Sequence, residues 1–407
     1  MGDVRRGLGG SPRRSRPSML WNLFSSEGPP PAPDMSAPAV RLEKVSKQYS
    51  KKVVASEGVS SGERPEENGS RSKRKTAAQT KVTVAAVQDL SFFANPGEIF
   101  AVLGPNACGK TTTLRCLTTL TVPDRGSIEM YGIDILRWPL VARQMLGYVA
   151  QDAGVDKVLT GREHLDLFAD LAHLDKATKR RNIAELIDLL DLGNFIDNLT
   201  GTYSGGIKKR LDIALALIGQ PAILVLDEPS VALDLESRQG MWDILRSYRD
   251  KGGCIILTSH FLEEVDALAD RLVIMDKGRQ IALGTPSQLK EQLGGDRATI
   301  RASEFTDRAM AEKIVAILKA KGLFIDAIIN EAQGNAVELV IPRDQNMGPK
   351  IIAELQNEGI SNLFGFAQSR PSLGDVYLSA TGKSFSDEDS KNKESRTVDA
   401  LRKEAMR

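Results

Sequence analysis

The sequence predicts an α/β protein with a core of buried strands and helices, a helical insertion in that core, and a small α+β domain near the C-terminal end. Two observations predict the core. A short apolar strand leads through a glycine-rich loop into a helix near residue 104, and a second apolar strand ends in Asp227 and Glu228. Strand and helix patterns that alternate after residue 296 predict the small domain.

The composition is that of an ordinary globular chain. Of its 407 residues, 41% are hydrophobic and 26% charged, and this length suggests more than one domain. Lys plus Arg is 54 and Asp plus Glu is 53, so no overall basic field favours nucleic acid. The odd number of cysteines disfavours a disulfide framework and favours a reducing compartment. Because no apolar run reaches the roughly 18 residues of a membrane helix, we expect any action at a membrane to go through a partner.

Residues 1–38 are predicted to be a disordered leader. They are rich in arginine, serine and proline and poor in acidic residues, which is typical of an organelle transit peptide. The alternatives are a plain disordered tail and an upstream start in a chain whose translation begins at Met35. The charged segment 383–407 is predicted to be a disordered tail.

Two predicted strands flank a polar insertion. Residues 40–45 alternate apolar and polar side chains, and residues 82–87 resume the sheet. The segment 50–81 has too little apolar surface to offset the entropy of ordering it, so we expect a disordered insertion. Its basic cluster, residues 71–75, is interpreted as a solvated charge run, with binding to acidic lipid or nucleic acid as the alternative.

The glycine-rich loop from Gly104 to Thr112 fits the phosphate-binding pattern G-x-x-x-x-G-K-[ST]. The apolar strand 99–103 precedes it and a helix is expected to follow. Backbone N–H groups of the loop and of the helix N-terminus carry partial positive charge toward a bound anion. Lys110 adds a full charge for the β- and γ-phosphates, and the Thr111 hydroxyl can ligate Mg²⁺. The loop therefore predicts a triphosphate site in a P-loop NTPase core.

A helical block is predicted between about residues 150 and 220. Apolar residues recur at helix spacing from residue 161 to about 192. A small-residue turn at Ser204 begins another helix, which is expected to end before the proline at position 221. We expect this helix to direct the side chains of Lys208, Lys209 and Arg210 toward solvent.

Polar residues follow two further buried strands. The strand 223–226 closes in Asp227 and Glu228, and the strand 254–259 is followed by His260. Ligands of open α/β sheets bind at the carboxyl ends of the strands. We therefore expect the phosphate loop, the acidic pair and the histidine to converge on one site.

The C-terminal part is predicted to be a separate small domain. From about residue 296 the order is strand, helix, strand, strand, helix, strand, which predicts a ferredoxin-like fold. We place this accessory domain at residues 293–382, after a core at residues 39–292.

These motifs together resemble the ATP-binding cassette (ABC) family, over about residues 39–290 without the insertion. The resemblance implies Mg²⁺ held by Thr111, Asp227 and Gln151, with Glu228 as general base and with Lys110 and His260 on the γ-phosphate. It also implies which residues contact ATP: Tyr49 on the adenine, Gln151 and Asp234, and the signature residues Ser204, Gly205 and Gly206 of a second subunit. The remaining implied contacts come from the phosphate loop, namely Gly104, Pro105, Asn106, Ala107, Cys108, Gly109, Lys110, Thr111 and Thr112.

Residues 203–214 and 370–382 resemble, more narrowly, the drug-resistance type ATPases of ABC-2 exporters. That resemblance implies an ATPase that dimerises around ATP and drives a separate transmembrane permease. The chain is then expected on the cytoplasmic or stromal side of a membrane, held there by the permease and without nucleic acid, and the leader leaves plastid import open. Two rival classes are a soluble ABC ATPase acting on ribosomes, RNA or a cofactor-assembly scaffold, and a lipid-import cassette.

The sequence departs from the family pattern at two positions, and a cysteine in the phosphate loop has chemistry of its own. Ala107 stands where the family usually has Gly, and a positive φ there costs an alanine on the order of 1 kcal/mol. Ala232 departs likewise in the loop after the acidic strand. Cys108 lies beside Lys110 and a helix N-terminus, so we expect a lowered thiol pKa, inhibition by thiol reagents and protection by ATP.

Overall fold

The computed structural model describes residues 31–54, 79–151, 154–231, 233–304, 306–344, 346–360, 363–382 and 385. Most of the predicted leader, the predicted tail, the basic cluster 71–75 and Ala232 lie outside these residues. The part of the leader that is described is ordered, contrary to the prediction. Asp34 donates its N–H to the carbonyl of Tyr131 at 2.9 Å and accepts the N–H of Ala37 at 3.0 Å, which fixes a turn against the neighbouring sheet.

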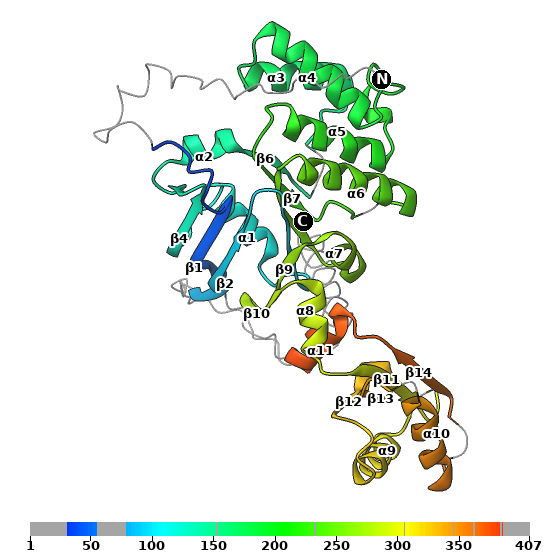
Figure 1. The fold of residues 1–407 in the computed structure, drawn as a ribbon. Coiled ribbons are helices and arrows are strands. Elements are labelled where there is room, and N and C mark those ends of the chain that lie inside the picture. The colour runs from blue at the N-terminus through cyan, green and yellow to red at the C-terminus, as the bar shows by residue number, and fades with distance from the viewer. Residues whose placement is uncertain are drawn as a thin grey trace, which may run out of the picture.

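The core is a six-stranded sheet in the order β10-β9-β3-β8-β7-β6 (Figure 1). Neighbouring strands pair parallel, except for the antiparallel pair β9–β10. Helices or a second sheet cover both faces, so Ile99 and Phe100 enter different apolar clusters. The strands are β3 Ile99–Leu103, β6 Leu146–Val149, β7 Ile223–Asp227, β8 Cys254–Ser259, β9 Arg271–Asp276 and β10 Arg279–Gly284.

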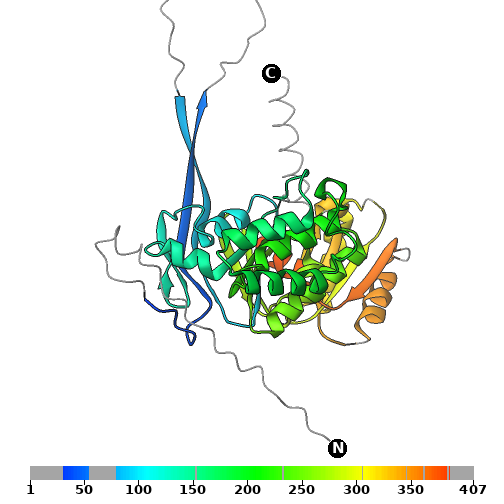
Figure 2. The same ribbon diagram turned by 90° about the horizontal axis from the view of Figure 1, so that it is seen from above.

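A second, antiparallel sheet has the order β2-β1-β4-β5. Its strands are β1 Val40–Val54, β2 Gln79–Ala94, β4 Arg125–Met130 and β5 Ile133–Asp134. The first two pair from Val40 opposite Ala94 out to Val54 opposite Gln79, and this hairpin projects from the body of the molecule (Figure 2). The predicted disorder is therefore wrong for residues 50–54 and 79–81, because the backbone ladder of the two strands continues into the insertion.

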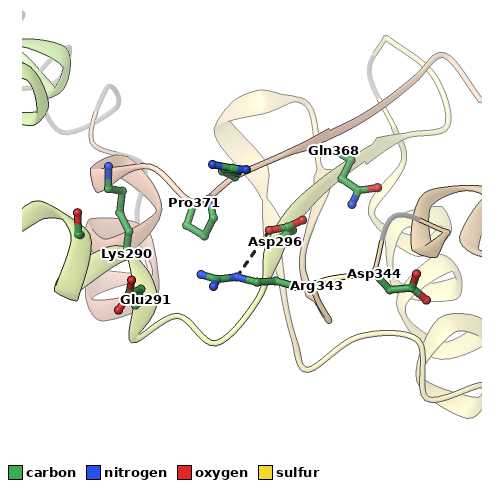
Figure 3. Close-up of a pocket in the computed structure, with 9 residues that line it drawn as sticks. Lys290, Glu291, Asp296, Arg343, Asp344, Gln368 and Pro371 are labelled. Atoms are coloured by element: carbon green, nitrogen blue, oxygen red, sulfur yellow. Dashed lines mark ion pairs between the residues drawn. The ribbon is translucent and has the colours of Figure 1, made fainter.

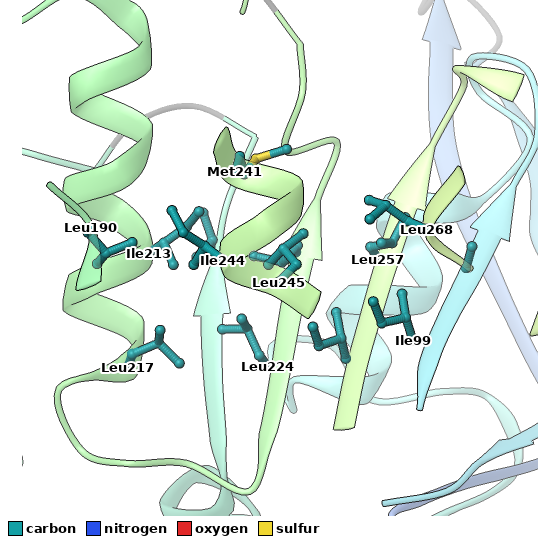
Figure 4. Packing of buried hydrophobic residues seen from close by; sticks show 14 of the residues in the cluster. Ile99, Leu190, Ile213, Leu217, Leu224, Met241, Ile244, Leu245, Leu257 and Leu268 are labelled. Atoms are coloured by element: carbon teal, nitrogen blue, oxygen red, sulfur yellow. The ribbon is translucent and has the colours of Figure 1, made fainter. Parts of the chain in front are cut away.

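Eight helices of the core surround these sheets within the described residues. They are α1 Lys110–Leu117, α2 Pro139–Met145, α3 Gly161–Leu171, α4 Lys176–Leu189, α5 Gly205–Leu217, α6 Leu235–Asp250, α7 Leu262–Leu268 and α8 Pro286–Glu291, with a 3-10 turn at Thr200–Thr202. A capping box between Thr160 and Glu163 begins α3. The helical block packs on the sheet through Leu190 and Leu217, which lie near Leu224 of β7 in one apolar cluster (Figure 4).

The accessory domain has the predicted ferredoxin-like order, and its strands form an antiparallel sheet β12-β13-β11-β14. Helices α9 and α10 cover one face of this sheet, where Ile314 and Ile351 pack against Val337 and Leu339. The elements are β11 Asp296–Arg301, α9 Arg308–Ala320, β12 Asp326–Asn330, a 3-10 turn at Glu331–Gln333, β13 Ala336–Ile341, α10 Met347–Asn357 and β14 Gly365–Ser369.

The last helix, α11 (Leu373–Thr381), leaves the accessory domain and packs on the core. Leu373, Val376 and Tyr377 are buried in the same apolar cluster as Val265 of α7 and Leu289 of α8. The predicted domain boundary, which assigned residues up to 382 to the accessory domain, therefore does not match the packing, since α11 packs on the core. Sequence order could not show this, because the apolar face of α11 fits either partner.

We expect Tyr377→Ala to lower the free energy of unfolding of the core by about 3–5 kcal/mol, the usual cost of truncating a buried aromatic side chain. Tyr377 is 0% exposed and meets the Phe385 ring edge-on at 5.0 Å. Urea unfolding measures the change, with Ser379→Ala on the exposed side of α11 as the control. A core transition that does not move would show that α11 adds nothing to core stability.

The joint between α8 and the accessory sheet contains a polar cavity of about 580 Å³. Figure 3 shows Lys290 and Glu291 of α8 on one side and Asp296 and Arg343 of the accessory domain on the other. The Arg343 Nε lies 4.0 Å from Asp296 Oδ1. Acidic and basic side chains line the cavity in equal number, so it has no net charge with which to select an ion.

Candidate active site

The predicted catalytic residues meet at the carboxyl end of the core sheet. A cleft of about 410 Å³ is lined there by Lys110, Thr111, Gln151 and Glu228, together with Asn106, Ala107, Gly109 and Thr112. The hairpin residues 84–86 and Lys277 of the β9–β10 turn line the same cleft and were not foreseen. No motif marks them, because they reach the cleft only through the packing of β2 and of this turn on the phosphate loop.

The phosphate loop is held in shape by close contacts. Gly109 has φ 113°, and a Cβ at this position would lie 2.2 Å from the Ala86 carbonyl oxygen, so no other residue fits. The Lys110 side chain is buried, and its ammonium donates to the carbonyls of Gly104 at 2.8 Å and Pro105 at 3.2 Å. The loop thus fixes the position of its cation before any phosphate is bound.

Ala107 has the positive φ that the family pattern suggested, with a value of 64°. A left-handed alanine is strained by roughly 1–2 kcal/mol, part of which is offset because glycine has more entropy to lose on folding. We therefore expect Ala107→Gly to raise the free energy of unfolding by up to about 1 kcal/mol, measured by urea unfolding. A variant less stable than the wild type would contradict this account of the loop.

Asp227 is placed by two hydroxyl groups. Its Oδ1 accepts a hydrogen bond from Thr258 Oγ1 at 2.6 Å and lies 3.4 Å from Thr111 Oγ1. Thr258 Oγ1 also accepts the N–H of Glu228 at 3.0 Å, so one buried threonine positions both acidic residues. Thr258 is the penultimate residue of the apolar strand β8, and a polar residue in a buried strand was the signal that could have indicated this role. A carboxylate beside a hydroxyl gives the oxygen-only donor set that suits Mg²⁺.

The Glu228 carboxylate contacts three polar side chains at the cleft, those of Lys110, His260 and Gln151. Its Oε1 lies 3.1 Å from Lys110 Nζ, and its Oε2 lies 3.3 Å from His260 Nδ1 and 3.4 Å from Gln151 Nε2. Burial alone would raise the pKa of Glu228, but the contact with His260 and the charge of Lys110 outweigh it and lower the pKa to about 2. Glu228 is thus ionised at neutral pH and neutralises the phosphate-binding lysine.

Tyr49 lies beside the cleft without lining it. Val84, its partner in the β1–β2 ladder, does line it, and directly opposed residues in a strand pair place their side chains on the same face. The Tyr49 ring is 41% exposed, and the Lys47 ammonium lies 5.7 Å from its centroid. The ring therefore has a free surface next to the cleft.

The signature residues and Asp234 lie outside the cleft in this single chain. Ser204 caps the start of α5, and Asp234 caps α6 by accepting the N–H of Ser237 at 2.8 Å. Gly205 is the first residue of α5, directly after Ser204. A Cβ at Gly206 of α5 would lie 2.5 Å from the Ser237 hydroxyl of α6, so the first turns of α5 and α6 are in contact. The structure thus brings these residues together with one another, but not with Lys110.

The prediction that Lys209 faces solvent is wrong. Its side chain is buried, and its ammonium donates to the carbonyls of Ala150 at 3.1 Å and Gln151 at 3.5 Å. The long apolar stem of a lysine can cross a packed surface to reach such carbonyls. The signature helix α5 is therefore tied directly to the loop that carries Gln151.

The prediction that the thiol pKa of Cys108 is lowered is also wrong. Its thiol is 2% exposed, and burial raises its pKa to about 11, which outweighs the charge of Lys110 and the N–H of the loop. The sequence showed the neighbouring charge but not that the side chain points into the protein. Burial raises the pKa of Cys116 to about 11 as well, and raises that of Cys254.

We expect the folded protein to react slowly with a thiol reagent such as iodoacetamide at pH 8. All three thiols are buried with raised pKa values, and the thiolate is the reactive form. Mass spectrometry of timed samples measures the labelling, with the urea-unfolded protein as the control that reacts fully. Labelling of Cys108 as fast as in the unfolded control would contradict its burial.

Comparison with known proteins identifies the family. A family model described as ABC transporter matches residues 87–231. The daunorubicin/doxorubicin resistance ATP-binding protein DrrA of Streptomyces peucetius is 37% identical over 73% of this chain and 88% of its own length. The Nod factor export ATP-binding protein I of Burkholderia pseudomallei is 43% identical over 52% of this chain and 69% of its own length. A solved structure of an ATP-binding subunit of an ABC transporter shares the fold, with a TM-score of 0.50 and 24% identity over 63% of this chain and 93% of that one. The chain therefore belongs to the ATP-binding cassette family, as an ATP-binding and ATP-hydrolysing subunit of an ABC transporter.

Proposed function

We propose that two copies of this chain enclose two ATP molecules between them and drive a separate membrane subunit that exports its substrate. The observation that carries the proposal is a cleft that one chain leaves incomplete. Lys110 and Glu228 line it, whereas Ser204 and Asp234 lie together on another surface. A second copy that presents its signature surface to the cleft would cover the open side of the nucleotide.

Each side chain of the cleft has a role that follows from its position. Lys110 and the loop N–H groups hold the β- and γ-phosphates, Glu228 orients and polarises the attacking water, and His260 contacts the γ-phosphate. Thr111, Asp227 and Gln151 would hold Mg²⁺, which supplies charge neutralisation on the phosphate oxygens. Tyr49 offers its ring to the adenine. Since Glu228 neutralises Lys110 in the absence of nucleotide, bound phosphates would compete for Lys110 and release the carboxylate toward the water.

We place the membrane subunit at a groove of about 310 Å³ between β6, α3 and α5. Ala150, the sequence neighbour of Gln151, lines the groove, and so does the partly exposed Phe168. Asp212 lines it too, and its nearly buried Oδ2 has no hydrogen-bond partner among the described residues. Burial raises the pKa of Asp212 to about 6, which makes its charge less favourable than in water, so a cationic or N–H donor group of the occupant would stabilise the charged form. An apolar segment with such a donor is the occupant that fits.

Export and location rest on the relatives and the leader. The two relatives named above are described as a drug-resistance ATP-binding protein and a Nod factor export ATP-binding protein, which supports export over a soluble role on ribosomes, RNA or a scaffold. In the described residues no helix has the length and apolar character to cross a bilayer. We therefore propose peripheral attachment through the permease, on the cytoplasmic side or, with plastid import, on the stromal side.

Affinity purification from detergent-solubilised membranes tests the partner. We expect one polytopic membrane protein in stoichiometric amount, and loss of this protein from Phe168→Ala and Asp212→Ala variants. Leu199→Ala, an exposed apolar residue outside the groove, is the matched control. Recovery of ribosomal RNA or a soluble scaffold in place of a membrane protein would refute the transporter role.

A further inference from the structure

Glu264 is a fully buried acidic residue for which the proposed reaction has no role. It lies on α7, four residues after His260 in the sequence, and its side chain is 0% exposed. A carboxylate is expensive to bury unless hydrogen bonds compensate it. Here two buried serines do so: Ser230 donates to Oε1, and Ser259 donates to Oε2 at 2.5 Å.

The two serines are buried next to different catalytic residues. Ser230 lies in the turn that follows Glu228, and the carbonyl of Glu228 closes this turn by accepting the N–H of Val231 at 3.3 Å. Ser259 ends β8 and immediately precedes His260. Its carbonyl accepts the N–H of Gly104 at 3.3 Å, so the start of the phosphate loop is tied to the same point.

We infer that Glu264 is a positioning residue for ATP hydrolysis, which fixes the spacing between Glu228 and His260 by bridging the turn after one and the strand end before the other. Glu228 Oε2 and His260 Nδ1 lie 3.3 Å apart on the cleft side of this bridge. The water to be activated and the γ-phosphate would lie between these two side chains in the proposed mechanism. A bridge behind them sets their relative position without touching the nucleotide.

The bridge predicts a separation between catalysis and nucleotide binding. Without it, the turn after Glu228 and the loop at His260 remain joined by the β7–β8 pairing and the Thr258 contact but become more mobile relative to each other, whereas Lys110 keeps its carbonyl contacts within the phosphate loop. A displacement of about 1 Å at a reacting group costs up to roughly 100-fold in rate. We therefore expect Glu264→Ala to lower kcat for ATP by about 10-fold to 100-fold and to leave the Kd of a fluorescent ATP analogue nearly unchanged.

Conservative and matched variants separate this role from stability. Glu264→Gln can accept from one serine and donate to the other, so it should retain most of the wild-type kcat. Ser230→Ala and Ser259→Ala remove one arm each and should lower kcat individually. Val265→Ala, a buried apolar truncation on the same helix, should lower stability with little change in kcat.

Two results would overturn the inference. One is a wild-type kcat in Glu264→Ala and in both serine variants, and the other is an equal loss of kcat in Val265→Ala. The inference rests on the proposed roles of Glu228 and His260, so a second measurement needs no activity. Hydrogen exchange of the nucleotide-free protein should speed up at residues 228–231 and 259–261 in Glu264→Ala but not in Val265→Ala. Unchanged exchange there would refute the bridge, whereas an inactive wild type would refute the proposed catalytic roles instead.

Discussion

Glu228→Gln is expected to lower kcat for ATP hydrolysis by roughly 100-fold to 10,000-fold, the usual range for the contribution of a positioned general base. The amide has the shape of the carboxylate, so the contacts that hold the turn in place survive. It carries no charge with which to polarise water. ATP binding should persist, because the phosphate loop and Lys110 are unchanged and the lysine no longer has a carboxylate to compete with the phosphates.

The same variant tests the proposed dimer. Because ATP that is not hydrolysed keeps holding the two copies together, size-exclusion chromatography of Glu228→Gln with ATP and Mg²⁺ should show a dimer that is absent without nucleotide. Glu236→Gln, an exposed acidic residue in the first turn of α6, should behave as the wild type. A strict monomer at saturating ATP would count against the two-copy site, and wild-type kcat in Glu228→Gln would remove this residue from the mechanism.

The sequence predicted the core because its strands are buried on both faces. Such strands appear as uninterrupted apolar runs, and the polar residues that follow them must lie at one edge of the sheet. This logic places Lys110, Asp227, Glu228 and His260 together, and the structure has them within contact distance of one another or of shared partners. The order of elements in the accessory domain was also predictable, because each strand and helix has its own hydrophobic periodicity in the sequence.

Contacts that do not follow from the position of strand ends in the sheet were not predictable. Lys209 was expected to face solvent because its charge was considered without the Gln151 loop that accepts its hydrogen bonds. Cys108 was expected to be reactive because its charged neighbour is visible in the sequence and its burial is not. The docking of α11 on the core and the bridge at Glu264 depend likewise on which surfaces meet. Residue type and sequence neighbours thus predicted which residues form the active site. The burial and hydrogen-bond partners of residues such as Lys209 and Cys108 depend on packing between elements.

Lys110→Met is expected to lower the free energy of unfolding of the nucleotide-free protein by about 3 kcal/mol, as well as to abolish tight ATP binding. The Lys110 and Glu228 side chains are only 4% and 7% exposed, and their charged atoms lie 3.1 Å apart. Removing the lysine leaves a buried carboxylate whose remaining side-chain contacts, among the described residues, are His260 and Gln151. The cost is then set by the unpaired charge more than by the lost contact.

A second substitution separates the cost of the unpaired charge of Glu228 from the cost of the lost Lys110–Glu228 contact. In Lys110→Met/Glu228→Gln no unpaired charge remains, so urea unfolding should recover about 2 kcal/mol of the loss, while ATP binding stays weak. The pKa of Glu228 is lowered from 4.5 to about 2, so its charge contributes stability above pH 4.5 that is lost as the pH falls toward 2. In Lys110→Met the charge of Lys110 no longer lowers this pKa, so Glu228 should take up its proton at a higher pH than in the wild type. The difference between the single and the double variant should therefore shrink from that higher pH downward. Equal stability of the two variants at pH 7 would mean that Glu228 does not restrain Lys110, and that ATP has no carboxylate to displace when it binds.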